Sequence, residues 1–452
     1  MMSQFSVIGA GLVGSLLSVY LGERGHRITV FDRRPDFRTR GAGGGRSINL
    51  ALSDRGLLAL EGAGLKDAVL PLCLPMHGRM IHDLDGTQHF QPYGKSGQYI
   101  NSVSRGELNL LMMQAADAHP NVAFQFEHSC LEFNLENGDL HMRDEAAGSN
   151  YTLRPELIFG TDGAFSALRS SLQRRPRFDY QQDYLPHGYK ELTIPPAADG
   201  GWLIDPEALH IWPRQSFMLI ALPNLDGSFT CTLFAPYDGP EGFDALQTPA
   251  LAEAYFDRYF ADAKALMPTL MQDFFDNPTS ALVTVRCYPW AYKNTLLLGD
   301  AAHAIVPFYG QGMNAGFEDC RALAQLIDQP GKDWSQIFRA FEQERKPNGD
   351  AIAELAKRNF LEMRDKVADP RFLLQKKIAA QVAERHPAHF TPVYSLVTFS
   401  DTPYATALAE MDRQQALFDR MFTWPDFESK WQDEYWERIE ALLLAREPSA
   451  RH

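Results

Sequence analysis

Three glycines near the start of the chain have the spacing of a phosphate-binding turn. They lie in the string GAGLVG at residues 9–14, which follows the short apolar run Phe5–Ile8. In such a turn Gly9 permits the tight bend, Gly11 lets the backbone approach a pyrophosphate, and Gly14 lets the helix pack closely on the strand. Asp32 ends the next apolar run and can accept a hydrogen bond from a ribose hydroxyl. The string predicts a dinucleotide site, with a glycine-rich turn made only for packing as the alternative.

A second glycine-rich string lies late in the chain. It reads GDAAH at residues 299–303 and continues through Pro307 to GQGMN at residues 310–314. Asp300 would lie at the carboxyl end of a buried strand, where open α/β sheets bind their ligands. The loop would then lead into a helix whose first N–H groups can face a polar ring edge or a negative charge. An ordinary strand–helix turn with a capping aspartate is the alternative, and His303 by itself indicates a structural histidine.

A third string, GTDGAFSALR at residues 160–169, also follows an apolar run. Its Asp162-Gly163 pair is a common turn, so the string is weak evidence when taken alone. The sequence shows no Ser-His-Asp arrangement and no metal-ligand spacing. We therefore predict no metal and no side chain that acts as nucleophile or base, which leaves the chemistry to a bound cofactor.

The apolar pattern indicates which elements hold these strings in place. The run Phe5–Ile8, a helical pattern that ends near Gly25 and the strand-like run Arg27–Phe31 form a βαβ unit. Further along, the pattern predicts a helical segment from Leu50 to Leu70, a strand-rich lobe from Pro176 to about Trp290, and a mainly helical part from Gly312 that includes an amphipathic helix from Trp431 to Arg446. The interpretation is an α/β fold in which a sheet-based lobe interrupts a nucleotide-binding domain.

Composition bounds the classes of protein to which the chain can belong. Its 452 residues are 45% hydrophobic and 22% charged, with a formal net charge of −14, values typical of a soluble globular protein. The acidic balance argues against a broad nucleic-acid interface, which needs a basic face. The five cysteines are scattered without a CxxC pair, so we expect a reducing cytoplasm and neither disulfides nor zinc. No segment approaches the roughly 20 apolar residues that span a bilayer, and the chain after Leu444 is short, charged and broken by proline, so we expect no membrane attachment.

Together and in this order, the three strings resemble those of the single-component aromatic hydroxylases that carry FAD and use NAD(P)H. In that family the middle string lies near both the flavin and the nicotinamide, and the late string contacts the ribityl chain and the isoalloxazine ring. The resemblance implies FAD contacts from Gly9, Gly11, Gly14, Asp32, Asp162, Asp300, Gly312, Met313 and Asn314. It also implies that FAD stays bound while NADPH binds transiently elsewhere, since only one full dinucleotide fingerprint is present.

A closer resemblance, covering nearly the whole chain, is to the branch of this family that hydroxylates kynurenine. It rests on GRSINLALS at residues 45–53, HGYKEL at residues 187–192 and YSLVTF at residues 394–399, among other stretches. The resemblance implies that L-kynurenine is hydroxylated at the 3-position with NADPH and O₂, through a flavin hydroperoxide. A flavin hydroxylase acting on another aromatic acid is the alternative. A non-catalytic FAD-fold protein that binds partners, such as a chaperone for prenylated proteins, is the rival from a different class.

Kynurenine ends in an α-amino acid, so a site for it needs donors for a carboxylate. By resemblance, Arg79 and Tyr93 supply this pair and Tyr394 adds a hydroxyl contact. The resemblance further implies that the amino-acid end and the ring are lined by Asn359 and Met363, and that the apolar walls are Ile220, Leu222, Phe234 and Phe308. Taken one at a time, the wall residues would indicate ordinary core packing.

Arginines are the other expected contacts to the cofactor. Arg105 matches a family residue near the FAD phosphates, and Arg40 or Arg46 could reach the pyrophosphate or the ring from a glycine-rich loop. Arg33, directly after the ribose-binding acid, is a candidate for the adenosine end. We expect the neighbouring Arg34 and Arg38 in a solvated charge run instead.

One departure from the family concerns the loop beside the flavin ring. Some members have His after its Pro-Phe pair, whereas this chain has Tyr309. A phenol can donate a hydrogen bond but does not titrate near neutrality unless strongly perturbed. A role for that imidazole in proton handling therefore does not carry over to this chain.

The predicted architecture is α/β, with a Rossmann-like FAD-binding domain, an inserted, mainly antiparallel sheet domain for the substrate, and a helical carboxyl-terminal part that closes the pocket. We expect the FAD-binding domain in residues 1–70, 100–175 and 290–330, the sheet domain in residues 71–99 and 176–289, and the helical part in residues 331–452. The protein is expected to be a monomer or a homodimer. Because its net charge is negative and its expected ligands carry anionic groups, binding must depend on local donors and helix N-termini.

Overall fold

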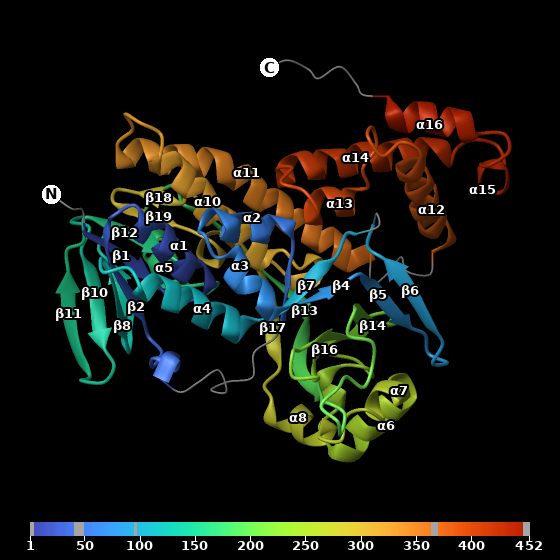
Figure 1. Cartoon of the computed structure of the whole chain (residues 1–452), viewed down its shortest axis with the longest axis horizontal. Helices are drawn as coiled ribbons and strands as arrows, with labels where there is room; N and C mark the ends of the chain where they lie inside the picture. The colour runs from blue at the N-terminus through green and yellow to red at the C-terminus, as the bar shows by residue number, and fades with distance from the viewer. Residues whose placement is uncertain (1–3, 40–48, 95–96, 363–368, 446–452) are drawn as a thin grey trace.

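The computed structural model describes residues 4–39, 49–94, 97–362 and 369–445 (Figure 1). Three predicted site residues, Arg40, Arg46 and Met363, lie outside these ranges. The described chain forms a parallel sheet with its helices, a larger and mainly antiparallel sheet, and a carboxyl-terminal group of helices.

The βαβ unit at the start of the chain lies within a six-stranded sheet of order β18-β19-β12-β1-β2-β8. Its strands are β1 (Gln4–Ile8), β2 (Arg27–Asp32), β8 (Val122–Phe126), β12 (Leu157–Gly160), β18 (Ala291–Tyr292) and β19 (Thr295–Leu297). The strand β1 pairs in parallel with both β2 and β12. Since a central parallel strand is covered on both faces, its sequence is a nearly continuous apolar run rather than an alternating one.

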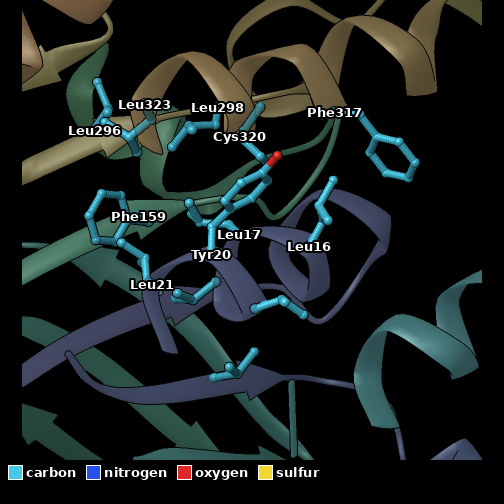
Figure 2. Close-up of a cluster of buried hydrophobic side chains, with 14 of the residues drawn as sticks. Leu16, Leu17, Tyr20, Leu21, Phe159, Leu296, Leu298, Phe317, Cys320 and Leu323 are labelled. Atoms are coloured by element: carbon cyan, nitrogen blue, oxygen red, sulfur yellow. The ribbon is translucent and has the colours of Figure 1, made fainter. Parts of the chain in front are cut away.

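The helix α1 (Leu12–Glu23) packs against α4 (Arg105–Asp117) and α10 (Gly312–Ile327). Figure 2 shows its Leu16, Leu17, Tyr20 and Leu21 in one buried cluster with Leu298, Cys320 and Leu323. Each of these side chains is at most 2% exposed. The apolar residues around the first and the late glycine strings therefore share one core, which holds the two strings side by side.

Two small three-stranded sheets flank this domain. One has the order β3-β7-β4 and the other β11-β10-β9. Their strands are β3 (Asn49–Leu52), β4 (Cys73–Met76), β7 (Ile100–Ser104), β9 (His128–Phe133), β10 (Leu140–Asp144) and β11 (Ser149–Leu153), and the short helices nearby are α2 (Asp54–Gly62), α3 (Lys66–Val69) and α5 (Ala167–Leu172).

Two sequence predictions are wrong in this region. The segment Leu50 to Leu70 begins with the strand β3, because its alternate residues pair with β7 rather than completing a helical face. The strand β4 pairs with β7 as well. It therefore does not join the larger sheet, to which the pattern assigned residues 71–99.

The larger sheet has seven strands in the order β17-β13-β16-β15-β14-β5-β6. They are β5 (Gly78–His82), β6 (Gln88–Pro92), β13 (Asp179–Ile194), β14 (Ala208–Arg214), β15 (Phe217–Pro223), β16 (Phe229–Pro236) and β17 (Ser280–Tyr288). All neighbouring strands are antiparallel except β14 and β5. The helices α6 (Pro249–Tyr259), α7 (Ala261–Lys264) and α8 (Leu270–Asp276) pack below it in Figure 1.

The strand β15 shows how this sheet separates packing from binding. Its residues Phe217, Leu219 and Ala221 lie in the core beneath α6 to α8. The alternate residues Ile220 and Leu222 belong to clusters on the other face. Because successive strand side chains point to opposite faces, one strand serves both purposes.

The carboxyl-terminal part consists of helices that begin with the long α11 (Trp334–Leu361), drawn across the top of Figure 1. The others are α12 (Pro370–Arg385), α13 (Val393–Thr398), α14 (Tyr404–Met421), α15 (Phe427–Lys430) and α16 (Trp436–Leu444). The predicted helix from Trp431 begins only at Trp436, because the chain turns so that these two indole rings meet at 5.9 Å. None of the helices in the described ranges is long and apolar enough to cross a membrane.

The predicted fold class is confirmed in its main features. An α/β domain with a GxGxxG turn is interrupted by a mainly antiparallel sheet and is followed by a helical part. The long strands β13 and β17 pair with each other and run between the two sheets (Figure 1).

Candidate active site

The glycine string forms the turn between β1 and α1, and its glycines have different surroundings. Gly9 has φ +105° and donates its N–H to the carbonyl of Phe31 at 2.7 Å. A Cβ added at Gly14 would lie 1.9 Å from the Gly9 carbonyl oxygen, whereas one added at Gly11 would meet nothing within 4 Å. Gly9 and Gly14 thus serve the tight turn and the packing. Gly11 faces open space beside the start of α1, whose first N–H groups have no side-chain cap.

Asp32, at the end of β2, is an ionised acceptor beside this turn. The Ala10 N–H donates to its Oδ2 at 2.9 Å, and the Arg34 side chain donates to Oδ1 at 2.9 Å and to Oδ2 at 2.8 Å. Burial by itself would raise the pKa of Asp32, but the bonds from Arg34 and Ala10 hold it below its ordinary value. The carboxylate is therefore oriented and charged, as contact with a ribose hydroxyl requires.

The prediction that Arg34 and Arg38 lie in a solvated charge run missed the ion pairs that both residues make. Arg34 makes the two-pronged contact to Asp32. Arg38 is paired with Asp36 at 2.7 Å, and its guanidinium lies 5.0 Å from the ring centre of Phe126. Arg33, the predicted adenosine contact, is exposed. Sequence alone could have favoured Arg34, because a residue two positions after a strand-ending acid points to the same side of the backbone.

The late string continues β19 into the short helix α9 (Asp300–His303), directly against α1. A Cβ at Gly299 would lie 2.9 Å from the Val13 side chain, so the two strings touch without room for another atom. Asp300 is accessible to solvent although burial by surrounding protein raises its pKa, which His303 and Arg105 partly offset. The carboxyl group of Asp300 is therefore accessible while surrounded by protein atoms. Arg105, exposed at the start of α4, is close enough to act electrostatically on it.

The middle string has a mainly structural role in this fold. Oδ2 of Asp162 accepts from the Ala167 N–H at 2.8 Å, and burial raises the pKa of this carboxyl. Its buried Oδ1 has no partner within the described residues. Arg169 is 2% exposed and donates to the Ala301 carbonyl at 2.9 Å. The string thus ties its own loop to α9, and Oδ1 of Asp162 is left for a ligand.

The loop after α9 includes the 3₁₀ turn η4 (Pro307–Tyr309) and leads into α10. Asn314 is fully buried: its amide donates to the carbonyls of Ala51 at 2.9 Å and Gly310 at 2.8 Å, and it accepts from the Ser53 N–H at 3.1 Å. Its side chain therefore secures the loop rather than facing a ligand. What Asn314 and the preceding Gly312 and Met313 present is backbone N–H groups at the start of α10.

Below this loop, a buried network of charges holds α10 in place. His303 and Asp319 approach to 2.6 Å, and Arg345 bonds Asp319 at 2.7 Å and Glu318 at 3.1 Å. Burial disfavours each charge, but the opposite partner wins: the pKa of His303 is raised, and that of Asp319 is lowered to about 2. His303 is thus a paired structural group, in line with its interpretation from sequence.

The residues present fit FAD. A dinucleotide needs a close backbone approach, a helix N-terminus for its pyrophosphate and an acid for its ribose, and Gly11, α1 and Asp32 offer these in one place. Asp300 and the uncapped start of α10 belong to the late string, which touches the glycine turn at Val13. A ribityl chain and a polar ring edge would reach these groups. The unpartnered Oδ1 of Asp162 is a further acceptor nearby.

A second cluster lies between the larger sheet and α13. The Arg79 guanidinium lies 4.8 Å from the ring centre of Tyr394 and 5.5 Å from that of Tyr93. The two phenol rings are stacked, with centroids 5.8 Å apart. Burial by itself would lower the pKa of Arg79, yet the electrostatic contacts with the Tyr394 and Tyr93 hydroxyls raise it. Three predicted carboxylate-binding residues are therefore brought together: Arg79 and Tyr93 from the β5–β6 region, and Tyr394 from the distant helix α13.

Apolar walls surround this cluster. Leu222, Ile220, Tyr93 and Tyr394 belong to one group. Phe234 and Phe308 pack ring to ring at 5.1 Å. Asn359 on α11 donates its amide to the Phe308 carbonyl at 2.7 Å, which fixes the loop beside η4. The predicted wall residues thus lie next to the predicted polar residues, beside the turn η4.

Two residues of this region are absent from the sequence prediction of the site. Tyr309 is 8% exposed and stacks on Tyr394 at 5.6 Å. Glu362 caps the end of α11, interacts electrostatically with the Tyr309 hydroxyl and is 3.6 Å from Lys376. The helical spacing of three residues from Asn359 is the signal that could have indicated Glu362, because such residues share a face.

Comparison with known proteins adds family information to this geometry. A family model described as FAD binding domain matches residues 2–356. The kynurenine 3-monooxygenase of Christiangramia forsetii is 48% identical over 97% of this chain and 98% of its own length. That of Myxococcus xanthus is 52% identical over 89% of this chain and 87% of its own, and that of Dictyostelium discoideum is 46% identical over 89% of each.

Solved structures share the fold at much lower identity. A structure of 2-methyl-3-hydroxypyridine-5-carboxylic acid oxygenase aligns with a TM-score of 0.66 over 82% of this chain and 95% of its own, at 19% identity. PqsL of P. aeruginosa, solved in complex with 2-aminobenzoylacetate, aligns with a TM-score of 0.65 over 80% of this chain and 97% of its own, at 20% identity. At such identity these alignments support the fold alone.

Proposed function

The chain belongs to the kynurenine 3-monooxygenases, within the family that shares this FAD-binding domain, and on that premise we propose that it catalyses FAD-dependent hydroxylation of L-kynurenine to 3-hydroxykynurenine, with NADPH as reductant and O₂ as oxygen source. The observation that carries the proposal is the Arg79, Tyr93 and Tyr394 cluster, placed beside the loop that follows α9. It is a candidate carboxylate site that contacts this loop through Tyr309.

The polar cluster would bind the carboxylate of the substrate. A guanidinium presents two parallel N–H donors that match the two carboxylate oxygens. The phenols of Tyr93 and Tyr394 add O–H donors, and burial is the main reason that the pKa of Tyr93 is raised, so this hydroxyl keeps its proton. Within the described residues, Arg79 has no acidic partner, so its charge is available to an anionic ligand.

The α-ammonium of the substrate needs an acceptor close to the carboxylate site. Glu362 is 16% exposed in its side chain and acts electrostatically on Tyr309, which contacts Tyr394. It is therefore a carboxylate close to the tyrosine cluster. We assign Glu362 to the ammonium and Asn359, which holds the Phe308 carbonyl, to the lining of the same end.

The apolar walls would hold the aminophenyl ring and exclude water from it. Ile220 and Leu222 from β15, with Phe234 and Phe308, form a surface without charge on this side of the sheet. Bound FAD supplies the redox chemistry, since it accepts reducing equivalents from NADPH and activates O₂ for transfer to the ring. The chain's part is to orient the ring, keep the site dry and hold the charges.

The cofactor groove explains why one nucleotide would stay bound and the other would not. The groups that would hold FAD are the single GxGxxG turn, Asp32 with Arg34, and the neighbouring pair Arg105 and Asp300. We call the surface that they form the cofactor groove. We assign FAD to this groove with its pyrophosphate at α1. NADPH then binds without a second fingerprint, as a transient co-substrate.

The test is product identification. The purified yellow protein is incubated with L-kynurenine, NADPH and O₂, and the product is compared with authentic 3-hydroxykynurenine by mass spectrometry and chromatography. Formation of this isomer supports the proposal. A flavoprotein that oxidises NADPH in response to another aromatic acid, and leaves kynurenine unchanged, would replace it with a different hydroxylase.

A pair of variants on one hairpin tests the carboxylate assignment. Arg79→Met on β5 keeps the alkyl stem but loses the donors, so kynurenine binding should weaken by about 2–5 kcal/mol while FAD is retained. His89→Ala on β6 is the control, because the His89 side chain is exposed and bonds the nearby Asp83. It should leave binding unchanged. Equal affinities of both variants for kynurenine would remove Arg79 from the site.

A further inference from the structure

Three tyrosines from three distant segments form a column beside Arg79. Tyr93 follows β6, Tyr309 lies in η4, and Tyr394 lies in α13. The Tyr394 ring is stacked with Tyr93 at 5.8 Å and an interplanar angle of 13°, and with Tyr309 at 5.6 Å and 22°. Tyr394 therefore has two aromatic neighbours: Tyr93, which follows β6 of the larger sheet, and Tyr309, from the loop after α9.

The Tyr309 ring is packed within the buried core of its loop. The ring is 8% exposed, and it belongs to the same cluster as Val306 and Ala315, which precede and follow the loop. Burial is the main reason that the pKa of its hydroxyl is raised, with further contributions from Tyr394 and Glu362. Tyr309 thus stays neutral, so it can pack and donate but cannot serve as a base near neutrality.

Through its contact with Tyr394, Tyr309 can influence the geometry of the carboxylate site. The Arg79 guanidinium lies 4.8 Å from the ring centre of Tyr394, closer than to Tyr93, and donates to the Tyr394 hydroxyl. Tyr93 is the second phenol that Arg79 bonds. The position of the Tyr394 ring thus contributes to where the donors of Arg79 point. Tyr394 itself sits on a six-residue helix of the carboxyl-terminal part, so contacts outside that helix must fix its ring.

We propose that Tyr309 is a positioning residue for the carboxylate of the substrate. By packing on Tyr394 from the flavin-side loop, it holds the Tyr394 hydroxyl against Arg79 and so aligns the donors of the carboxylate site. The inference rests on the proposed function, because it takes kynurenine as the ligand.

The test compares two ligands that differ by one group. Kynuramine has the aminophenyl ketone and the amine of kynurenine but lacks the carboxylate. Binding of each ligand to the oxidised holoenzyme is measured from the change in flavin absorbance, for the wild type, Tyr309→Phe and Tyr309→Leu. An aromatic stacking contact corresponds to roughly a two- to tenfold change in affinity.

We expect Tyr309→Leu to weaken kynurenine binding about tenfold and kynuramine binding by less than twofold, on the scale of one aromatic contact. Tyr309→Phe keeps the ring and should stay within twofold of the wild type for both ligands. A loss of the same size for both ligands would overturn the inference, because Tyr309 would then be a wall of the pocket. Unchanged kynurenine affinity in Tyr309→Leu would overturn it as well.

Two more variants, Tyr394→Leu and the double variant, test whether Tyr309 and Tyr394 act on the ligand through one contact. Tyr394→Leu should weaken kynurenine selectively, and adding Tyr309→Leu to it should cause little further loss, since both act through one contact. Fully additive losses would overturn the inference. If the wild-type holoenzyme binds no kynurenine at all, the proposed function fails, and that outcome is distinct from an equal loss of both ligands in the variants.

Discussion

Two alanine substitutions in the glycine string separate the packing role of Gly14 from the cofactor-binding role proposed for Gly11. Gly14→Ala places a Cβ 1.9 Å from the Gly9 carbonyl oxygen and 2.6 Å from the Thr161 hydroxyl. Since carbon and a carbonyl oxygen approach to about 3.3 Å at the closest, the start of α1 must move by roughly 1.4 Å. The closer contact is to backbone, so rotation of a side chain cannot relieve it; the second contact is to the side chain of Thr161, in the middle string.

Gly11→Ala is the matched change with the opposite expectation. Its Cβ would meet no atom within 4 Å, and Gly11 has φ −77°, which alanine adopts freely. The free protein should therefore tolerate it. If the pyrophosphate of FAD passes over Gly11, the same Cβ enters the ligand's space, at a cost of about 1–3 kcal/mol for overpacking. That corresponds to a loss of FAD affinity on the order of tenfold to a hundredfold.

Two measurements distinguish the two changes: the thermal midpoint without added FAD, and the dissociation constant of FAD from flavin fluorescence. Gly11→Ala should lower only the affinity, whereas Gly14→Ala should lower both. Normal FAD affinity in Gly11→Ala would refute the placement of the pyrophosphate over this glycine. An unchanged thermal midpoint in Gly14→Ala would refute the packing argument.

Three further predictions concern charged groups. Arg34→Ala should weaken FAD binding more than the adjacent control Arg33→Ala, because only Arg34 bonds the ribose-side acid Asp32; equal affinities in an FAD titration would contradict this. Arg345→Met should lower the free energy of unfolding by about 3–5 kcal/mol, since it leaves two buried carboxylates without their shared partner, and denaturant titration of the holoenzyme measures the loss. Burial lowers the pKa of His210 from 6.5 to about 4, so unfolding takes up a proton between these values. Stability contributed by the neutral ring is present above pH 6.5 and is lost as the pH falls through 4, up to about 3 kcal/mol; the thermal midpoint of His210→Gln should change less across this window, and an identical pH profile would argue against the assignment.

Much of the nucleotide domain could be predicted because its requirements are local. The GxGxxG turn, the apolar run of β1 and the acid that ends β2 each follow from backbone geometry over a few residues. Errors arose where pairing partners decide the element. Leu50 begins a segment with helical periodicity, yet its strand β3 pairs with β7, which lies about fifty residues away. Sheet pairing of this kind depends on tertiary context more than on local pattern.

The candidate site was predicted in its residue types but not in its internal contacts. Arg79, Tyr93 and Tyr394 follow from the family resemblance, whereas the Arg34 fork on Asp32 and the fully used amide of Asn314 do not. In both latter cases the deciding partner is set by the fold around the residue. A motif indicates which side chains the chemistry needs. It does not show which of them already have partners within the protein and which remain available to a ligand.

The sequence by itself determined the βαβ turn, the family and the chemical class of the reaction, because these depend on glycines, apolar periodicity and motif order over short stretches. The stacking of Tyr309 on Tyr394, the contact of Tyr394 with Arg79 and the closeness of Glu362 to Tyr309 became visible in the tertiary structure alone. These residues come from a hairpin, a loop and two helices of different parts of the chain. Their contacts depend on how separate packed units are placed against each other, and no local spacing records that placement.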